Sequence, residues 1–244
     1  MRLFGLIGFP LAQSFSKKYF AEKFLEEGIK GVAYELFELE NINQFPGILK
    51  KHPNLVGINV TIPYKQEVLA YLQELDLEAK AIGAVNCIKI TPQGLKGYNT
   101  DAAAFENSLK PLLRPHHKKA LVLGTGGAAK AVAYVLQKLS IDFKYVSRSR
   151  KNNGFTYEEL NEQVLNEFTL IVNCTPLGSY PKTGGVPAIP YEYISSRHYL
   201  YDLVYNPPLT LFLQNGQKKG AAIKNGYDML VGQAELGWQI WNAE

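Results

Sequence analysis

Cysteines, histidines and long apolar runs are all scarce in this chain of 244 residues. The two cysteines, Cys87 and Cys174, lie far apart with no C-x-x-C pattern, so the sequence predicts neither a disulfide framework nor a thiolate metal site. We expect both to be small buried residues, which fits a reducing compartment. The four histidines show no metal-ligand spacing, and His116 and His117, beside Pro115, are expected in a solvated turn. The sequence therefore predicts no metal.

No apolar run reaches the roughly 18 unbroken residues that a membrane span requires. The N-terminal run in M-R-L-F-G-L-I-G-F-P-L-A-Q-S is short and is broken by Gly8 and Pro10. These breaks favour a strand and a turn over a signal peptide. We therefore interpret the sequence as that of a soluble, cytoplasmic protein.

An excess of charge of one sign is also lacking, with 26 basic and 22 acidic residues and a net charge of +4. The lysines and arginines are dispersed, so the sequence does not predict nucleic-acid binding. The exception is a local basic cluster, S-R-S-R-K at 147–151. Hydrophobic residues make up 46% of the chain, as in ordinary globular proteins, and the length suits two modest domains.

The sequence does contain a regular alternation of strand-like and helix-like segments. Residues 1–100 predict one α/β unit with a mixed sheet, in which T-P-Q-G forms the turn of a hairpin. The pattern restarts after P-H-H-K-K at 115–119, where K-A-L-V-L-G has the continuous apolar character of a buried parallel strand. No internal repeat is found. The predicted fold class is α/β with two domains.

Three helix predictions rest on local signals. Pro63 is expected to begin a helix in P-Y-K-Q-E-V-L-A-Y-L, because proline is favourable at the first helical position. A proline is likewise expected to begin the helix in P-P-L-T-L-F-L-Q-N-G. The segment Y-E-E-L-N-E-Q-V-L at 157–165 is expected to be a single helix.

The motif G-T-G-G-A-A at 124–129 follows a predicted strand and opens a predicted helix, which is the context of a dinucleotide-binding turn. Gly124 would make the tight turn, Gly126 would let the backbone approach the pyrophosphate, and Ala129 would allow close packing of helix on strand. Free N–H groups at the helix N-terminus would hold the phosphates. The alternative is an ordinary tight turn between strand and helix.

The end of the next strand carries V-S-R-S-R-K where an NAD site would carry an acidic residue for the ribose 2′-hydroxyl. Arg148 can pair with a 2′-phosphate, and the hydroxyls of Ser147 and Ser149 lie on either side of it in sequence. NADP is therefore the predicted cofactor, and the alternative is a solvated basic loop.

Two charged residues are candidates for acid/base chemistry, which hydride transfer to a carbonyl requires. Lys65 in N-V-T-I-P-Y-K is placed in the first turn of the helix predicted after Pro63, where the helix dipole disfavours a cation by roughly 0.3–1 kcal/mol. Asp101 in G-Y-N-T-D lies at a strand-to-helix junction, where capping is the ordinary role of an aspartate. If the two face each other across a cleft, Lys65 gains an anionic partner.

Polar residues at strand ends are candidates for substrate binding. Ser14 and Ser16 lie between the first strand and the first helix, where hydroxyls and free N–H groups suit a carboxylate, although Ser16 could simply be an N-cap. Asn59, Thr61 and Asn86 lie at or just beyond strand ends, where α/β sheets bind ligands. Each of these three could also be an ordinary turn residue.

The sequence resembles that of the shikimate dehydrogenase family over nearly its whole length. The resemblance rests on an ordered series of motifs: G-F-P-L-A-Q-S-F-S, N-V-T-I-P-Y-K, A-I-G-A-V-N-C-I, G-Y-N-T-D, G-T-G-G-A-A-K, V-S-R-S, N-C-T-P-L-G, D-L-V-Y-N-P and N-G-Y-D-M-L-V-G-Q-A. No single motif decides the matter, but their occurrence in this order by chance is very improbable.

The resemblance implies roles for particular residues. Lys65 and Asp101 would be the catalytic acid/base pair. The implied substrate-binding residues are Ser14, Ser16, Asn59, Thr61, Lys65, Asn86, Asp101, Tyr205 and Gln233. The implied cofactor-binding residues are Gly124, Thr125, Gly126, Gly127, Ala128, Ser147, Arg148, Ser149, Thr175, Leu203, Gly226 and Met229. Residues 1–102 and 226–244 would form the substrate domain, and 103–225 a Rossmann-type NADP domain, with the C-terminal helix returning to the first domain.

Several positions depart from the usual family pattern. They are Lys17, Tyr19 and Phe20 after the serines, Ala102 and Ala104 after the aspartate, Ser147 before the arginine, and Asp228 in the return segment. The departures leave Lys65 and Asp101 in place. They bear on the shape of the cleft and on the discrimination of the 2′-phosphate.

The activity implied by the resemblance is the reversible NADPH-dependent reduction of 3-dehydroshikimate to shikimate, in aromatic amino-acid biosynthesis through chorismate. A related enzyme acting on quinate, or with NAD, is the nearest alternative. A non-catalytic metabolite sensor on the same scaffold is a further one, although a sensor would not require both Lys65 and Asp101. The chain is expected to be a monomer or a homodimer.

Overall fold

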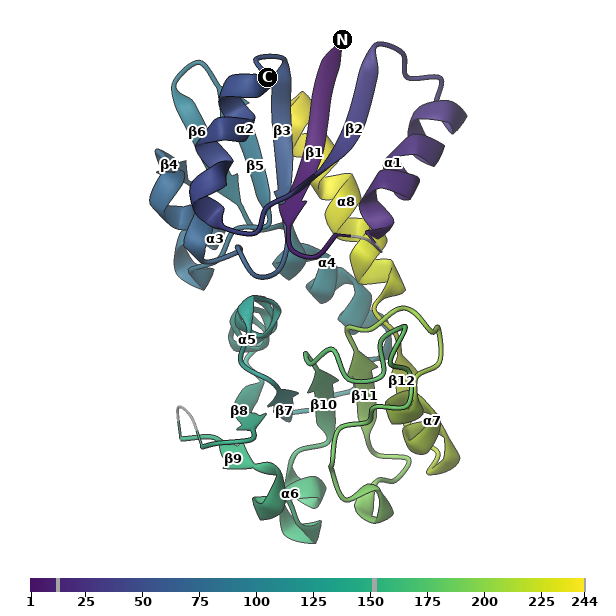
Figure 1. Ribbon diagram of the computed structural model, residues 1–244. Helices are drawn as coiled ribbons and strands as arrows, with labels where there is room; N and C mark the ends of the chain where they lie inside the picture. Colours follow the sequence, from purple (N-terminus) through teal and green to yellow (C-terminus); the bar gives the residue numbers. More distant parts are fainter. Residues whose placement is uncertain (12–13, 151–152, 244) are drawn as a thin grey trace. The chain divides into compact units, whose positions relative to one another are not determined.

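The computed structural model describes residues 1–11, 14–150 and 153–243. The chain divides into two compact units, one of Met1–Thr100 with Ala234–Glu244 and the other of Asp101–Gln233. Figure 1 follows the chain through both, and each has the α/β architecture predicted from the sequence. Which ligand each unit binds stays a prediction, as does the division into a substrate domain and a cofactor domain.

The first unit is built on a mixed six-stranded sheet with the order β2-β1-β3-β5-β6-β4. β1 pairs in parallel with β2 and β3, whereas β3, β5 and β6 pair antiparallel in succession, which confirms the predicted mixed sheet and hairpin. The strands are β1 Arg2–Gly8, β2 Val32–Glu38, β3 Leu55–Val60, β4 Glu74–Leu75, β5 Cys87–Thr91 and β6 Gly94–Tyr98.

Both faces of this sheet are covered, because alternate residues of β1 belong to different apolar clusters. Phe4 and Leu6 pack with aromatic residues of α1 and α8, and Leu3 and Ile7 pack with residues of α2, α3 and the 3₁₀ helices. The helices of this unit are α1 Phe15–Glu26, η1 Ile42–Gln44, α2 Phe45–Lys51, η2 Glu67–Tyr71 and α3 Leu77–Ile82, with the C-terminal part of α8 Tyr227–Asn242.

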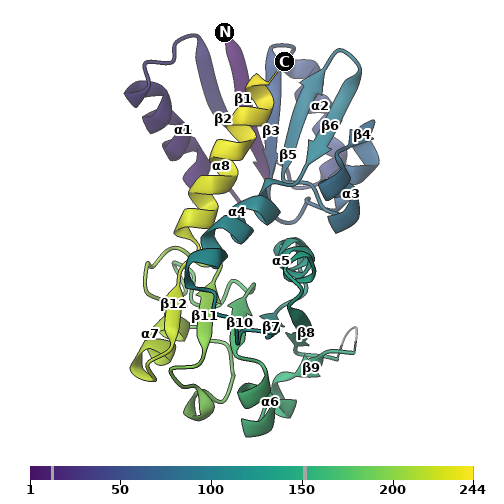
Figure 2. The ribbon, with the colours of Figure 1, turned by 180° about the vertical axis from the view of Figure 1, so that it is seen from behind.

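Trp241 anchors the end of α8 on the first sheet. Its ring stacks on Phe4 with 5.1 Å between ring centroids, and its Nε1 donates a hydrogen bond to the Ile88 carbonyl at 2.9 Å. A Cβ added at Gly57 would lie 2.3 Å from the Trp241 ring. The C-terminal part of α8 therefore packs on β3 at a position where only glycine leaves room, and Figure 2, the view from behind, shows this part of the helix lying over the first sheet.

The second unit is built on a six-stranded sheet with the order β12-β11-β10-β7-β8-β9, in which every pairing is parallel. The strands are β7 Lys119–Leu123, β8 Asp142–Ser147, β9 Phe155–Thr156, β10 Leu170–Asn173, β11 Tyr199–Asp202 and β12 Ala222–Lys224. The helices are α4 Thr100–Leu109, η3 Lys110–Leu112, α5 Gly127–Lys138, η4 Tyr157–Glu159, α6 Glu162–Glu167, η5 Tyr191–Tyr193 and α7 Leu211–Lys218, followed by the start of α8. This is the Rossmann-type arrangement predicted for the cofactor domain.

The prediction that an α-helix begins at Pro63 is wrong. The segment forms turns up to Gln66 and then the short 3₁₀ helix η2. In an α-helix the Lys65 carbonyl would accept from the N–H four residues later, but here it accepts from the Val85 N–H at 2.8 Å. Since no α-helix begins here, the argument that Lys65 opposes a helix dipole no longer applies.

Two further helix predictions are corrected by capping side chains. The segment 157–165 is not one helix, because Asn161 accepts from the Val164 N–H at 3.1 Å and starts α6 after a separate 3₁₀ turn. α7 begins not at a proline but after Thr210, whose side chain caps the Leu213 N–H. His117, expected in a solvated turn, is only 3% exposed.

None of the helices in the described part of the chain combines the length and the apolar character that crossing a bilayer requires.

Candidate active site

The glycine motif forms the turn between β7 and α5. Gly124 has φ +99°, a conformation that L side chains rarely adopt, and a Cβ there would lie 3.1 Å from Thr175 Cγ2. Gly126 is the N-cap of α5, and a Cβ added to it would meet no atom within 4 Å. Ala129 is fully buried, as close packing of helix on strand requires.

These features fit a dinucleotide. The first N–H groups of an α-helix have no acceptor within the helix, and they carry the positive end of its dipole. The glycine at 126 is not required by any neighbouring protein atom, so the room beside it is available to a ligand. The turn can therefore hold a pyrophosphate by its backbone.

The basic loop after β8 contains two arginines with different surroundings. Arg150 forms an ion pair with Glu159, whereas Arg148 is exposed and has no ion-pair partner in the described ranges. Ser147 Oγ donates to the Ser149 carbonyl at 2.6 Å and shapes the loop between them. Lys151, the last residue of the basic cluster, lies outside the described residues. Arg148 is thus the arginine that can pair with a phosphate without breaking an existing ion pair.

The loops after β10 and β11 carry several of the predicted cofactor residues. Thr175 donates to Asn173 Oδ1 through both its backbone N–H, at 3.0 Å, and its hydroxyl, at 2.6 Å. The Gly226 N–H donates to the Val204 carbonyl at 3.1 Å, and a Cβ at Gly226 would lie 2.1 Å from the Leu203 carbonyl oxygen. The structure therefore brings Gly226 against Leu203 at a contact that only glycine permits.

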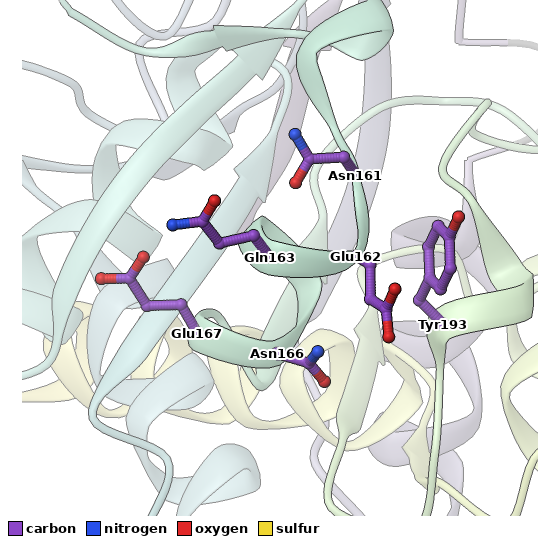
Figure 3. Close-up of a pocket in the computed structure, with 6 residues that line it drawn as sticks. All are labelled: Asn161, Glu162, Gln163, Asn166, Glu167 and Tyr193. Atoms are coloured by element: carbon purple, nitrogen blue, oxygen red, sulfur yellow. The ribbon is translucent and has the colours of Figure 1, made fainter.

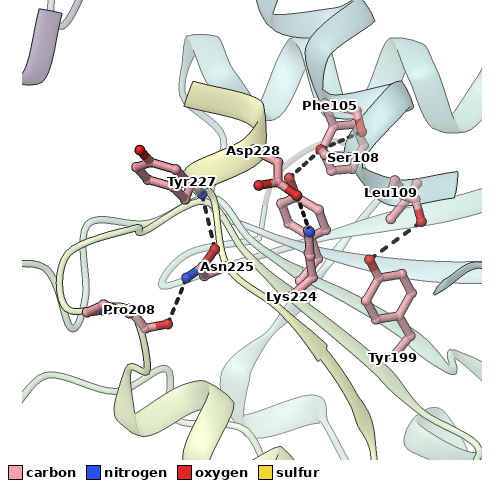
Figure 4. A network of polar contacts seen from close by, with 10 residues as sticks. Phe105, Ser108, Leu109, Tyr199, Pro208, Lys224, Asn225, Tyr227 and Asp228 are labelled. Carbon is pink, nitrogen blue, oxygen red and sulfur yellow. Dashed lines mark hydrogen bonds and ion pairs between the residues drawn. The ribbon is translucent and has the colours of Figure 1, made fainter. Parts of the chain in front are cut away.

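The start of α8 is fixed by its own polar contacts, which Figure 4 shows. Asn225 Nδ2 donates to the Pro208 carbonyl at 2.9 Å, and its Oδ1 accepts from the Tyr227 N–H at 3.2 Å. Asp228, an unusual residue for this position, forms an i,i+4 ion pair with Lys224 and lies in the first turn of the helix, where an anion is favourable. Met229, the next residue, is buried.

In the first unit, a chain of hydrogen bonds joins three of the predicted substrate residues. The Tyr34 hydroxyl donates to Asn59 Oδ1 at 2.8 Å, and Ser16 also hydrogen-bonds the Tyr34 hydroxyl. Burial of Tyr34 raises its pKa, and the hydrogen bond from Ser16 opposes that rise in part. Asn59 Nδ2 in turn donates to the Asn86 carbonyl at 3.3 Å.

The chain of hydrogen bonds reaches the start of α4. Asn86 Nδ2 donates to Thr100 Oγ1 at 2.9 Å, and Asn86 Oδ1 accepts from the Thr100 N–H at 2.7 Å. Both ends of the Asn86 amide are therefore used to hold the residue directly before Asp101. The sequence did not single out Tyr34 or Thr100, although the alternation of β2 indicates that Tyr34 points into the unit.

Ser14 has a buried hydroxyl at the start of α1. It occupies the N-cap position of α1, yet its side chain makes no capping bond, and its Oγ has no hydrogen-bond partner among the described residues. Ser16 lies inside α1, so the alternative interpretation of Ser16 as an N-cap is wrong. Because leaving a buried polar group unsatisfied costs about 1–3 kcal/mol, the Ser14 hydroxyl suits a ligand acceptor.

Lys65 is held by its neighbours in the turn. Tyr64 is buried and donates from its hydroxyl to the Leu39 carbonyl, and its own carbonyl accepts from the Val68 N–H at 2.9 Å. Thr61 precedes this turn, and its N–H donates to the Ile7 carbonyl at 2.9 Å. The backbone around Lys65 is thus fixed by the core of the first unit.

Asp101 and Gln233 belong to the second unit. Asp101 is 5% exposed and lies within the first turn of α4, so it is not the N-cap. Gln233 Nε2 donates to the Leu230 carbonyl at 3.0 Å. Tyr205, the third predicted substrate residue in this unit, is partly buried, and this burial raises the pKa of its hydroxyl. The pairing of Lys65 with Asp101 stays a prediction.

A separate hollow of about 750 Å³ lies over α6 and is unrelated to these residues. Figure 3 shows the six side chains that line it: Asn161, Glu162, Gln163, Asn166, Glu167 and Tyr193. Its charged groups are both carboxylates, which do not suit a phosphate-bearing cofactor. In the described ranges, no His, Cys, Asp and Glu side chains gather in a group of three or more that could hold a metal ion.

Comparison with known proteins gives consistent matches. A family model described as the shikimate dehydrogenase substrate binding domain matches residues 6–88. The shikimate dehydrogenase (NADP(+)) of Clostridium beijerinckii is 40% identical over 255 residues, covering 99% of this chain and 92% of that protein. The enzyme of the same name from Caldanaerobacter subterraneus subsp. tengcongensis is 35% identical, covering 100% of this chain and 92% of that protein.

Solved structures give the same result. A shikimate dehydrogenase in complex with NADP+ has a TM-score of 0.86 and 31% identity, covering 99% of this chain and 90% of that one. The shikimate 5-dehydrogenase of Thermus thermophilus, in complex with NADP(H) and shikimate, has a TM-score of 0.86 and 31% identity. That match covers 99% of this chain and 94% of that one.

Proposed function

The chain belongs to the shikimate dehydrogenase family, and on this premise we propose that it catalyses the reversible NADPH-dependent reduction of 3-dehydroshikimate to shikimate. It is an NADP-dependent oxidoreductase that acts on a CH–OH group, in the biosynthesis of aromatic amino acids. The observation that carries the proposal is the buried hydroxyl of Ser14, which has no hydrogen-bond partner among the residues that the structure describes. It is close in sequence to Ser16 and to the hydrogen-bonded chain that Ser16 begins. An anionic, polyhydroxylated substrate matches such a set of groups.

The backbone of residues 124–128 would hold the NADP pyrophosphate, and Arg148 with Ser147 and Ser149 would bind the 2′-phosphate. Thr175, Leu203, Gly226 and Met229 would lie along the nicotinamide side. When bound, NADPH supplies the hydride that reduces the ketone carbon. Two features support NADP over NAD: Arg148 has no ion pair within residues 1–11, 14–150 and 153–243, and the sequence has no acidic residue at the end of β8.

The substrate carboxylate would accept hydrogen bonds from Ser14 and Ser16. The ring hydroxyls would be held by the polar groups that follow the strands of the first unit and by residues of α4 and α8. These are Asn59, Thr61, Asn86, Asp101 and Gln233, with Tyr205 beside the ring. Since the Asn59 Oδ1 already accepts from Tyr34, the amide of Asn59 would present its remaining N–H to the substrate.

Lys65 and Asp101 would act as the acid/base pair. The Lys65 ammonium would donate a proton from Nζ to the developing alkoxide oxygen and accept it in the reverse reaction. The Asp101 carboxylate would stabilise the ammonium and keep it oriented.

The role of Lys65 is tested by Lys65→Ala, with Lys80→Ala on α3 as the matched control. We expect Lys65→Ala to lower kcat by about 10²–10⁴, the usual contribution of a general acid. The dissociation constant of NADPH should not change in either variant. If Lys65→Ala kept most of its kcat, the assigned role would be wrong.

We also place the activity in the cytoplasm and expect a monomer or a homodimer, with shikimate and NADP as the only binding partners proposed. Light scattering coupled to size-exclusion chromatography distinguishes the two assemblies, and a larger oligomer would contradict both.

A further inference from the structure

Asp202 is a fully buried carboxylate at the end of β11 that the sequence analysis did not single out. Its Oδ1 accepts from Asn173 Nδ2 at 2.9 Å and from the Val204 N–H at 3.0 Å. Its Oδ2 accepts from Thr210 Oγ1 at 2.6 Å. In the described part of the chain it forms no ion pair, so these three donors are what satisfies the carboxylate.

The first donor connects Asp202 to the loop after β10. Asn173 uses its Nδ2 for Asp202, which leaves its Oδ1 to face the next residues of the chain. That Oδ1 accepts both the N–H and the hydroxyl of Thr175. Thr175 Cγ2 in turn lies beside Gly124, 3.1 Å from the position that a Cβ added to this glycine would occupy. The Asp202 carboxylate therefore orients an amide that fixes Thr175 beside the glycine turn.

The second and third donors connect Asp202 to the loop after β11 and to α7. The bond from the Val204 N–H turns the chain directly after Leu203, and the Val204 carbonyl accepts from the Gly226 N–H. Thr210 is 1% exposed, and its oxygen also accepts from the Leu213 N–H at 3.4 Å as the N-cap of α7. One side chain thus holds both ends of the segment from Val204 to Thr210.

A carboxylate suits this position better than a neutral side chain. It accepts at both oxygens, whereas an amide in its place would turn one acceptor into a donor. Burial raises the pKa of Asp202 to about 6, and the hydrogen bonds from Thr210, Val204 and Asn173 oppose that rise. Three titratable groups, Cys174, Tyr191 and Tyr201, are close enough to be affected by its charge, and burial together with the charge of Asp202 raises the pKa of each.

We propose that Asp202 is a positioning residue, which holds the loops after β10 and β11 in the arrangement that the nicotinamide half of the cofactor requires. It acts through Thr175 and the Leu203–Gly226 contact and does not itself touch the ligand. The inference rests on the proposed function, because those residues are the ones assigned to the nicotinamide side.

The test compares two ligands on Asp202→Asn, with Asp142→Asn, an exposed residue of β8 in the same sheet, as the control. One ligand is NADPH, and the other is adenosine 2′,5′-bisphosphate, which has the 2′-phosphate but no nicotinamide. We expect Asp202→Asn to weaken NADPH binding and to lower kcat by about tenfold or more, since small misplacements at a reacting centre can cost up to roughly a hundredfold. The affinity for adenosine 2′,5′-bisphosphate should stay that of the unmutated chain, and Asp142→Asn should change neither affinity.

Equal losses for both ligands would overturn the proposal, because they indicate a general structural role. Unchanged NADPH binding and kcat would overturn it as well. If Asp202→Asn does not fold, as judged by circular dichroism, Thr210→Val and Thr210→Ser replace it, since only the second keeps the donor to Asp202. Thr210→Val should then lose affinity for NADPH but not for adenosine 2′,5′-bisphosphate, and Thr210→Ser should lose affinity for neither. Equal affinities of the two variants for NADPH would overturn the proposal.

The pair of affinities does not depend on turnover. A chain that oxidises no shikimate would contradict the proposed function, and the ratio of the two affinities would still decide the role of Asp202. The double variant Asp202→Asn with Thr175→Val tests whether Asp202 acts through Asn173 and Thr175. Effects that are not additive support action through Asn173 and Thr175, and additive effects contradict it.

Discussion

At the scale of the residue, hydrogen bonds already present in the protein decide which side chains are available to a ligand. Ser14 Oγ has no partner among the described residues, and Arg148 has no ion pair there. By contrast Arg150, two positions further along, is paired with Glu159. The proposed function assigns the substrate carboxylate to Ser14 and the 2′-phosphate of the cofactor to Arg148.

The different surroundings of the two arginines give a prediction for cofactor choice. Arg148→Ala should raise the KM for NADP+ by about tenfold to a hundredfold, since a hydrogen bond to a charged group contributes about 1.5–3 kcal/mol. The KM for NAD+ should hardly change, because NAD+ has no 2′-phosphate. Arg150→Ala serves as the control and should leave both values as they are. Steady-state kinetics with each cofactor checks this, and equal effects of the two variants would contradict the assignment to Arg148.

Some residues of the candidate site could be predicted from the sequence and others could not. Lys65, Asp101 and the glycines belong to local motifs whose chemistry can be interpreted within a few residues. Tyr34 and Thr100 could not be found in this way, because their partners lie 25 and 14 residues away in the sequence. Asp202 was missed for the same reason, since its role depends on where the ends of β10 and β11 meet.

At the scale of the element, the main error concerned the segment after Pro63. Its local signals favour an α-helix, but the Lys65 carbonyl bonds to the Val85 N–H, and this non-local bond replaces the bond that a helix would have made. The strands and long helices were predicted because their apolar pattern is continuous or periodic. The two-residue strand β9 and the three-residue strand β12 are too short to show a period.

The packing of α8 on β3 gives a prediction for stability. Gly57→Ala should lower the free energy of unfolding by about 1–3 kcal/mol, because the new methyl group would overlap the Trp241 ring. Gly47→Ala is the matched control, since Gly47 lies inside α2 with nothing within 4 Å of its added Cβ. There alanine should raise the free energy of unfolding by about 0.5–1 kcal/mol through helix propensity. Urea unfolding measures both, and a Gly57→Ala variant as stable as the unmutated chain would contradict the packing of Trp241 described above.

At the scale of the whole molecule, the alternation of strands and helices was enough to predict two α/β domains, the first with a mixed sheet. The Rossmann type of the second domain was implied by the resemblance to the family. The alternation did not predict which polar residues are buried. His117 is the clearest case, because Pro115 and two lysines beside it indicate a solvated turn. Instead its Nδ1 accepts from the Arg114 N–H at 2.9 Å, and its Nε2–H donates to the Arg197 carbonyl at 3.1 Å.

This buried neutral histidine predicts a loss of stability in acid. Burial lowers the pKa of His117 to about 4, with the neighbouring His116 contributing, so the unfolded chain binds a proton more readily than the folded one. The stabilising contribution is therefore fully present above pH 6.5 and is lost as the pH falls towards 4, by up to about 3 kcal/mol. The raised pKa of Asp202, about 6, has the opposite effect. Below about pH 6 the folded chain binds this proton more readily than the unfolded chain, so protonation of Asp202 offsets part of the loss of stability in acid.

Comparison of the unmutated chain with His117→Asn isolates the histidine, because asparagine keeps an acceptor for Arg114 and does not titrate. The free energy of unfolding in urea, measured at pH 7.5 and 5.0, should fall less between the two pH values in the variant. Identical pH dependence in the two chains would show that His117 is not the group responsible.

The central claim is that the chain is an NADP-dependent shikimate dehydrogenase. It is tested most directly by the kcat/KM of the purified chain for shikimate and for quinate, each with NADP+ and with NAD+, followed by the absorbance of the reduced nicotinamide. The account predicts that shikimate with NADP+ gives the highest value of the four. A higher value with quinate or with NAD+, or no turnover in any combination, would contradict it.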